Sequence, residues 1–246
     1  MQRILGVLGG MGPLATVDFM EKLVTATPAD RDQDHVAVIA ASLPQIPDRS
    51  DAITGDGPSP LAAMVGTLGR LERAGAQAIA IACNTAHHWH ADIQRHTALP
   101  VLHIADAAIG EMTSAGAGHG TRVGVLATTG TLEAGIFRHR LADAGMDCVD
   151  LTAGDQQSLV MAGIRAVKGG DMDTGAALLA AAADALRARG AERIIMACTE
   201  VPPAMAHAGA HAGRQGPGYV DATAALARAC VAWARVNEDA VEQIAA

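Results

Sequence analysis

The sequence is poor in aromatic side chains, in cations and in long apolar runs. Aromatic residues make up 2% of the 246 residues although 50% are hydrophobic, so the core must consist mainly of aliphatic side chains. No apolar run reaches the roughly 18 residues that a membrane-spanning helix needs. The 18 lysines and arginines are outnumbered by 26 acidic residues, which gives a net charge of −8. Because phosphate binding depends on cations, we expect no nucleic-acid partner. Because the apolar runs are short, we expect no membrane partner.

Cysteine is also scarce. Four cysteines in a chain of 246 residues cannot form the dense disulfide frame of a small secreted domain. No signal-peptide pattern precedes the first apolar run, at residues 3–8. We therefore expect a cytoplasmic protein whose thiols stay free.

Short apolar runs alternate with helical segments along the whole chain. We predict strands at residues 3–8, 35–41, 79–82, 100–104, 122–127, 146–149 and 193–197. This alternation is typical of an α/β fold with parallel sheets. The spacing between Gly6 and Gly124 nearly equals that between Cys83 and Cys198. The sequence therefore predicts two pseudo-symmetric domains, each a parallel sheet flanked by helices, with the active site in the cleft between them.

The domain boundaries follow from composition. We expect residues 1–104 and 213–246 to form a discontinuous first domain, closed by a C-terminal helix from Asp221 to about residue 245, and residues 105–212 to form the second. Residues 42–60 are rich in proline and glycine and are expected to be a long functional loop. Residues 209–218 are expected to be a glycine-rich linker.

Two cysteines stand at the ends of predicted strands. In open parallel sheets, ligands bind beyond the carboxyl ends of the strands, which is where Cys83 and Cys198 lie. Asn84 and Thr199 follow them and can cap a helix. A helix N-terminus that points at a sulfur atom would lower the thiol pKa. The other two cysteines, 148 and 230, lie in apolar segments and are expected to be core residues.

Two thiols facing each other across a cleft suit the inversion of a stereocentre, because one can remove a proton from carbon while the other returns one to the opposite face. Nucleophilic chemistry with one cysteine would instead need a histidine and an acid in support. His87, His88 and His90 follow Cys83 and raise the possibility of zinc. Their spacing is not that of a zinc finger, so we expect no metal and a structural role for His87.

Two turns and two cations are further candidates for a binding site. Residues 10–15 fit a loose dinucleotide motif, but no acidic residue follows the second strand to hold a ribose. We interpret this segment, and the turn at 128–131, as tight turns whose backbone N–H groups can bind a carboxylate. Arg49 and Lys168 lie in or beside loops, and such cations would bind a second carboxylate.

Five segments together resemble a known family. They are residues 9–16, 43–50, 83–87, 126–131 and 198–202. With them the chain resembles the cofactor-independent aspartate/glutamate racemases, and the aspartate racemase branch in particular. The pairing of Cys-Asn-Thr with Cys-Thr-Glu is the most specific part of this resemblance. Ala197 and the pair His88–Trp89 depart from the family pattern without removing a catalytic group.

The resemblance implies a homodimer that needs neither pyridoxal phosphate nor a metal, with Cys83 and Cys198 as the two acid/base thiols. It implies an amino-acid substrate whose side-chain carboxylate is held by Arg49 and Lys168. The remaining residues of the expected substrate site are Met11, Asn84, Thr85, Ala86, Thr128, Thr129 and Thr199.

The leading hypothesis is an amino-acid racemase that acts on aspartate, or on glutamate, through two bases. Two alternatives stay open at this point. One is an isomerase of the maleate or hydantoin type that uses one cysteine as a nucleophile. The other is a protein without catalytic activity that binds an acidic metabolite.

Overall fold

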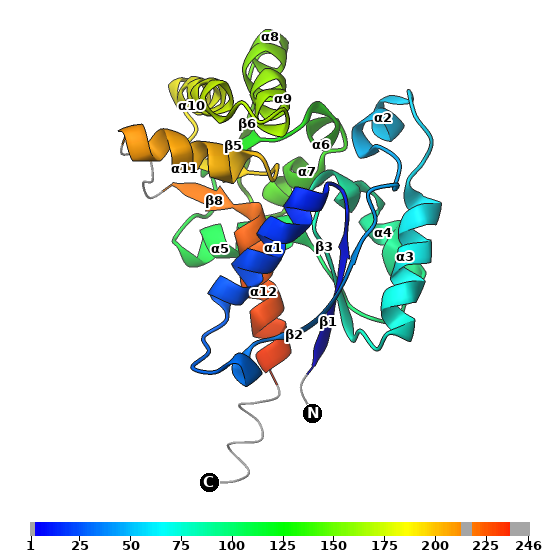
Figure 1. Ribbon diagram of the computed structural model, residues 1–246. Coiled ribbons are helices and arrows are strands. Elements are labelled where there is room, and N and C mark those ends of the chain that lie inside the picture. The colour runs from blue at the N-terminus through cyan, green and yellow to red at the C-terminus, as the bar shows by residue number, and fades with distance from the viewer. Residues whose placement is uncertain (1–2, 213–217, 237–246) are drawn as a thin grey trace.

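The structure, a computed structural model, describes residues 3–212 and 218–236. These residues form two four-stranded sheets with helices packed around them (Figure 1). The first sheet has the strand order β2-β1-β3-β4 and the second has the order β6-β5-β7-β8. Every neighbouring pair of strands is parallel. The predicted α/β fold with two similar parallel sheets is confirmed.

The strands follow the same succession in both sheets. The first sheet consists of β1 (Ile4–Gly9), β2 (Ala37–Ser42), β3 (Ala78–Ile81) and β4 (Val101–Leu102). The second consists of β5 (Arg122–Leu126), β6 (Asp147–Val149), β7 (Arg193–Met196) and β8 (Tyr219–Asp221). β3 and β7 therefore hold equivalent places, and each leads into one of the two strand-end cysteines.

Helices connect the strands and cover the sheets. Before residue 104 they are α1 (Pro13–Ala26), α2 (Arg49–Thr54), α3 (Leu61–Arg73) and α4 (His90–Arg95), with short 3-10 turns η1 (Asp32–Asp34) and η2 (Thr85–Trp89). They continue with α5 (Ile104–Ser114), α6 (Thr129–Glu133), α7 (Ile136–Asp143), α8 (Ala153–Asp155), a π-helical turn η3 (Gln156–Met161), α9 (Ala162–Lys168), α10 (Met172–Ala188), α11 (Val201–Ala212) and α12 (Ala222–Arg235). None of the helices in the described ranges is long and apolar enough to cross a membrane.

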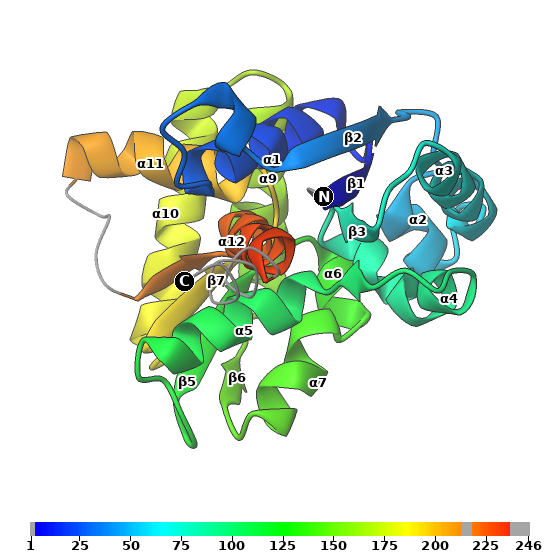
Figure 2. The same cartoon turned by 90° about the horizontal axis from the view of Figure 1, so that it is seen from below.

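One hydrophobic cluster runs through both halves of the molecule. It contains Leu5 of β1, Val123 of β5 and Leu226 of α12, all fully buried. Helix α12 lies between α1 and α5 (Figure 2) and packs against both. Asp221 caps α12 as predicted, since its carboxylate accepts hydrogen bonds from the backbone N–H groups of the second and third residues that follow it. The core thus fixes the two sheets relative to one another.

The segment after Cys198 differs from the sequence prediction. Residues 209–212, expected to belong to a linker, are part of α11, because Val201, Ala204 and Met205 bury one face of that helix in the core of the second half. Strand β8 was not predicted, and it pairs with β7. The C-terminal segment, assigned above to the first domain, therefore contributes to both halves. The linker residues 213–217 and the predicted end of the last helix lie outside the described residues.

The long loop at residues 42–60 is not wholly irregular, because it contains helix α2. Asp48 begins this helix by accepting hydrogen bonds from the backbone N–H groups of Ser50, at 2.7 Å, and Asp51, at 3.1 Å. The helix packs against α6 of the other half. A short capped helix can hold a side chain in place, so the loop can position Arg49.

Candidate active site

The two strand-end cysteines meet at one small cavity. Cys83 follows β3 and Cys198 follows β7, and both side chains are buried. The cavity has a volume of about 40 Å³, far below the several hundred Å³ of a typical site for a larger ligand. Its lining residues come from both halves of the chain: Met11, Asp48, Arg49, Ser50, Cys83, Asn84, Thr85, Thr128, Lys168, Ala197, Cys198, Thr199 and Glu200.

Most of the residues expected at the site line this cavity, but two of them lie elsewhere. Ala86 is fully buried in the hydrophobic cluster of the first half. Thr129 faces helical turn η3, where its backbone N–H donates to the sulfur of Met161 and its hydroxyl accepts a hydrogen bond from Gln157 at 3.3 Å. Four lining residues were not expected, and among them Glu200 contacts a cysteine directly.

Asn84 is a buried polar residue of the cavity whose side-chain amide lacks hydrogen-bond partners among the described residues. Its side chain is 4% exposed, and neither its amide nitrogen nor its amide oxygen hydrogen-bonds to a described residue. Asn84 occupies the N-cap position of the following turn, but its side chain makes no capping hydrogen bond, contrary to the sequence prediction. A buried amide without partners costs about 1–3 kcal/mol. A polar ligand in the cavity would remove this cost, so Asn84 is a strong candidate for substrate binding.

Three threonine hydroxyls join the two halves beside the cavity. Thr85 Oγ1 lies 2.8 Å from Thr131 Oγ1 and 3.2 Å from Thr128 Oγ1. The hydroxyls of Thr128 and Thr131 are 3.0 Å apart. Thr131, which is 1% exposed, was not among the expected site residues, because its partner Thr85 is far from it in the chain. This cluster holds the strand-end turn of the first half against α6 of the second.

Arg49 reaches the cavity from helix α2. Its Nη1 donates to the backbone carbonyls of Ile46, at 3.2 Å, and Pro47, at 2.9 Å. Its Nε is buried and has no hydrogen-bond partner among the described residues. Backbone carbonyls thus hold Nη1 of the guanidinium in place, while Nε can still donate a hydrogen bond to a ligand. This is the arrangement that a cation needs to receive a carboxylate.

The approach of α2 to the other half requires a glycine at position 130. A Cβ atom there would lie 3.0 Å from Ser50 Cα, closer than packed side-chain atoms normally come. Because the contact is with backbone, it cannot be relieved by rotating a side chain. Gly130 therefore allows the loop that carries Arg49 to close over the cavity.

Cys198 has a carboxylate partner. Its thiol donates a hydrogen bond to Glu200 Oε2 at 2.9 Å, and the Thr199 hydroxyl donates to the same oxygen at 3.1 Å. Burial raises the pKa of the Cys198 thiol well above its ordinary value, the charge of Glu200 adds to this, and the ammonium of Lys168 opposes it. The predicted lowering of this pKa by a helix N-terminus is therefore wrong for the free protein, since burial and the carboxylate outweigh it.

Hydrogen bonds of two of the histidines after Cys83 go to the backbone: His87 binds Cys83 and Ile104, and His90 binds Val101. His87 Nδ1 lies 2.9 Å from the Cys83 carbonyl oxygen, and His87 Nε2 accepts a hydrogen bond from the backbone N–H of Ile104 at 3.2 Å. His87 is thus neutral, and burial lowers its pKa to about 3. This agrees with the structural role predicted for His87. Within residues 3–212 and 218–236, no group of three or more histidine, cysteine or acidic side chains could hold a metal ion.

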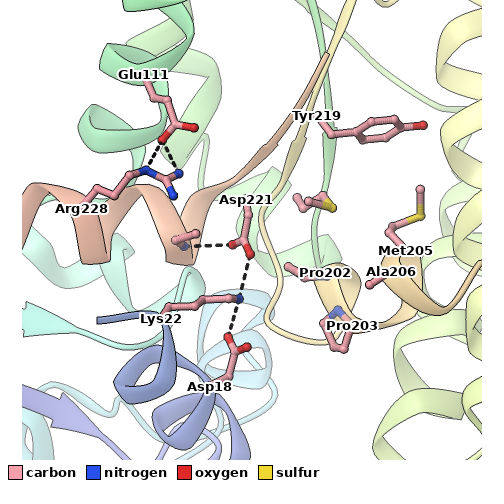
Figure 3. Close-up of a pocket in the computed structure, with 12 residues that line it drawn as sticks. Asp18, Lys22, Glu111, Pro202, Pro203, Met205, Ala206, Tyr219, Asp221 and Arg228 are labelled. Carbon is pink, nitrogen blue, oxygen red and sulfur yellow. Dashed lines mark hydrogen bonds and ion pairs between the residues drawn. The ribbon is translucent and has the colours of Figure 1, made fainter. Parts of the chain in front are cut away.

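A larger cavity, of about 600 Å³, lies between α1, α11, β8 and α12. Figure 3 shows Lys22 between two carboxylates there, with its Nζ 2.6 Å from Asp18 and 2.8 Å from Asp221, and Arg228 paired with Glu111. These charges are already matched with one another, and no cysteine lines the cavity. The smaller cavity between Cys83 and Cys198 is therefore the candidate active site.

Known proteins are similar to the chain in sequence and in fold. A family model described as Asp/Glu/Hydantoin racemase matches residues 8–230. The aspartate racemase of Picrophilus torridus is 31% identical to the chain and has a TM-score of 0.79, with 94% of each chain covered. An aspartate racemase homologue from Pyrococcus horikoshii, 22% identical, shares the fold with a TM-score of 0.74 over 95% of this chain and 99% of its own.

A relative described as having broad specificity is also similar. The broad specificity amino-acid racemase RacX of Bacillus subtilis is 28% identical over 152 residues. The matched region covers 59% of this chain and 63% of RacX, so the similarity spans less than two thirds of that protein.

Proposed function

The chain belongs to the Asp/Glu/hydantoin racemase family and is a racemase-family isomerase, and on that premise we propose that it racemises an acidic amino acid, aspartate first, through two cysteines and without a cofactor. The observation that carries this proposal is the common cavity of Cys83 and Cys198. One thiol comes from each half of the fold, at equivalent strand ends. A binding protein without activity, one of the alternatives above, does not fit an isomerase family.

In the proposed reaction, one cysteine thiolate removes the Cα proton of the bound amino acid. The thiol on the opposite side then donates its proton to the other face of the carbanion. One proton leaves and one arrives, so the product differs from the substrate only in configuration. The buried amide of Asn84 and the nearby backbone N–H groups would stabilise the negative charge that spreads into the α-carboxylate.

The side-chain carboxylate of the substrate would bind Arg49 and Lys168. Arg49 supports this role because its buried Nε has no partner among the described residues. Both cations line the cavity. The likeness to the Picrophilus torridus aspartate racemase favours aspartate over glutamate as the first substrate to test.

A broader substrate range is a second candidate, and Lys168 favours it. The Lys168 side chain is 57% exposed and its Nζ lies 3.9 Å from Glu200 Oε1, so its charge is partly matched before any substrate binds. A site with one free cation would select acidic side chains less strictly. RacX, a broad specificity racemase, provides the precedent.

The decisive test is a panel of L-amino acids incubated with the purified protein without added cofactor, followed by chiral chromatography. We expect D-aspartate to form fastest. Equal rates with many neutral amino acids would favour the broader range. No racemisation of any amino acid, together with turnover of maleate or a 5-substituted hydantoin, would instead support the one-cysteine isomerase.

We also propose that the protein is a homodimer. Helix α1 exposes three large apolar side chains to solvent: Leu14 is 83% exposed, Val17 62% and Val24 53%. Exposed apolar side chains on one helix suit contact with a second copy of the chain. Light scattering should give twice the monomer mass, and Leu14→Asp should lower it. A monomer at all concentrations would contradict this proposal.

A further inference from the structure

Glu200 distinguishes the two thiols of the cavity. Its Oε2 accepts the hydrogen bond of the Cys198 thiol at 2.9 Å, and its side chain is 17% exposed. Cys83 has no such partner: among the described residues its hydrogen bonds involve the backbone and not the sulfur. The two cysteines are therefore equivalent in the fold but different in chemistry.

A thiol can donate a hydrogen bond to a carboxylate only while it keeps its proton. Loss of that proton would place a thiolate beside a carboxylate in a buried site, where like charges repel strongly. Lys168, at the end of α9, lies 3.9 Å from Glu200, and its side chain is more than half exposed, so it offsets the repulsion only in part. Asp48 and Arg49, at the start of α2, are the other charged groups of the cavity.

We propose that Glu200 keeps Cys198 protonated in the free enzyme, so that the resting enzyme has Cys198 as the proton donor and Cys83 as the proton acceptor and is ready for one of the two directions of racemisation. This rests on the proposed racemase function and makes Glu200 a positioning residue for that reaction. In the first turnover, the Cys83 thiolate takes the Cα proton and becomes a thiol. Cys198 gives its proton to the opposite face and becomes a thiolate beside Glu200. Before the next cycle in the same direction, Cys83 must lose its proton to solvent and Cys198 must regain one.

The first experiment measures the ionisation of Cys198 without any turnover. The protein is alkylated with iodoacetamide over a range of pH, and modification of Cys198 is followed by peptide mass spectrometry. Glu200→Gln should move the midpoint of the rate profile to lower pH and raise the rate near neutral pH, about tenfold for each unit by which the pKa falls. An unchanged or higher midpoint would overturn the proposal.

Two further variants serve as controls for this experiment. Glu133→Gln removes the same charge from an exposed position on α6 of the same half and should leave the Cys198 midpoint where it is. Glu200→Asp keeps the charge on a shorter side chain, and its midpoint should lie above that of Glu200→Gln. If Glu200→Gln fails to fold, judged by circular dichroism, the comparison of Glu200→Asp with the unmodified protein still decides, because a longer contact to the carboxylate should lower the midpoint.

The second experiment measures the pH dependence of racemisation. Two enantiomers have equal free energy, so kcat/KM must be the same in both directions. The decline of kcat/KM at high pH reports loss of the proton from the donor thiol. Glu200→Gln should shift that decline to lower pH, and Glu133→Gln should not. If racemisation occurs but neither the decline nor the alkylation midpoint moves, the role of Glu200 is wrong while the proposed function stands. If the midpoint moves but no amino acid is racemised, the proposed function is wrong while the effect of Glu200 on Cys198 stands.

Discussion

The segments 83–85 and 198–200 occupy equivalent places in the two halves but carry different side chains. Two residues after the cysteine, the first half has Thr85 and the second has Glu200. The Thr85 hydroxyl joins a cluster with Thr128 and Thr131, whereas the Glu200 carboxylate accepts a hydrogen bond from Cys198. The same backbone position therefore holds a residue that links the two halves in one case, Thr85, and a residue that controls the protonation of a thiol in the other, Glu200.

The residues directly after the cysteines differ as well. Asn84 has a buried amide without partners among the described residues, while the hydroxyl of Thr199 donates to Glu200. A repeated fold can thus bring two like groups to one cavity and still give them separate tasks. Reactions that need an acid and a base at the same moment depend on this kind of asymmetry.

Removing either thiol of the cavity should cause the largest loss of racemase activity. We expect Cys83→Ser and Cys198→Ser each to reduce racemisation by roughly 10²–10⁴-fold, the contribution of a positioned acid or base. Exchange of the Cα proton with deuterium from solvent should persist for one enantiomer in each variant, and for opposite enantiomers in the two. Cys148→Ser, at a cysteine outside the cavity, is the matched control. Normal racemisation by either active-site variant would exclude the two-base mechanism.

Arg49→Ala should cause the next largest loss of racemase activity. It removes the cation that the α2 loop brings to the cavity. We expect kcat/KM for aspartate to fall roughly 10- to 100-fold, since a hydrogen bond to a charged group contributes about 1.5–3 kcal/mol. The loss with alanine as substrate should be much smaller. Arg95→Ala, at an exposed arginine on α4, is the control. Equal losses for aspartate and alanine would remove Arg49 from the site for the side chain.

A buried histidine of the first half and a buried thiol of the second should make the stability of the protein depend on pH in opposite senses. Burial keeps the pKa of His87 at about 3, whereas a histidine of the unfolded chain takes up a proton below a pH of about 6.5. The unfolded state therefore binds more protons between these values, and stability should fall as the pH falls, by up to about 1.4 kcal/mol per pH unit for this histidine.

Urea unfolding at several pH values checks this. His87→Gln should make the dependence on pH shallower in the acid range, and His96→Gln, at an exposed histidine, should not. Cys198 acts in the opposite sense: since its pKa is raised in the folded state, its contribution is present at neutral pH and is lost as the pH rises past the ordinary thiol value. An acid dependence unaffected by His87→Gln would show that other groups control it.

The smallest expected effect concerns the threonine cluster. Thr85→Val removes the hydroxyl that bridges the halves and should cost about 1 kcal/mol of unfolding free energy, the usual contribution of a hydrogen bond. Thr113→Val, on the exposed side of α5, should cost less. Unlike Glu200→Gln, Thr85→Val should leave the pH profile of racemisation in place. A shifted profile would mean that Thr85 also controls a thiol.

The fold and the reactive groups could be predicted from local sequence patterns. Apolar runs that stop at Cys83 and Cys198 predicted strand ends, and strand ends of parallel sheets lie where ligands bind. Asp221 was predicted as a helix cap because capping depends on the chain immediately around it. The extension of helix α11 over residues 209–212 and strand β8 were missed, because packing against α10 and pairing with β7 stabilise them more than their own composition does.

The contacts between the halves could not be predicted in the same way. Thr131 and Gly130 matter because of Thr85 and Ser50, which are far from them in the chain. Glu200 belongs to the Cys-Thr-Glu motif, but its contact with Cys198 depends on the conformation of the turn. The state of the thiol depends on burial, which no short stretch of sequence reports.

The sequence by itself determined that this is a two-halved α/β protein with a cysteine at the end of one strand in each half, because strand pattern and turn chemistry are local properties of the chain. Only the tertiary structure decided that both cysteines share one cavity, that α2 closes on α6, and that a carboxylate holds one thiol and not the other. Those features arise from distances and burial between segments far apart in the chain, and these exist only once the two sheets are packed together.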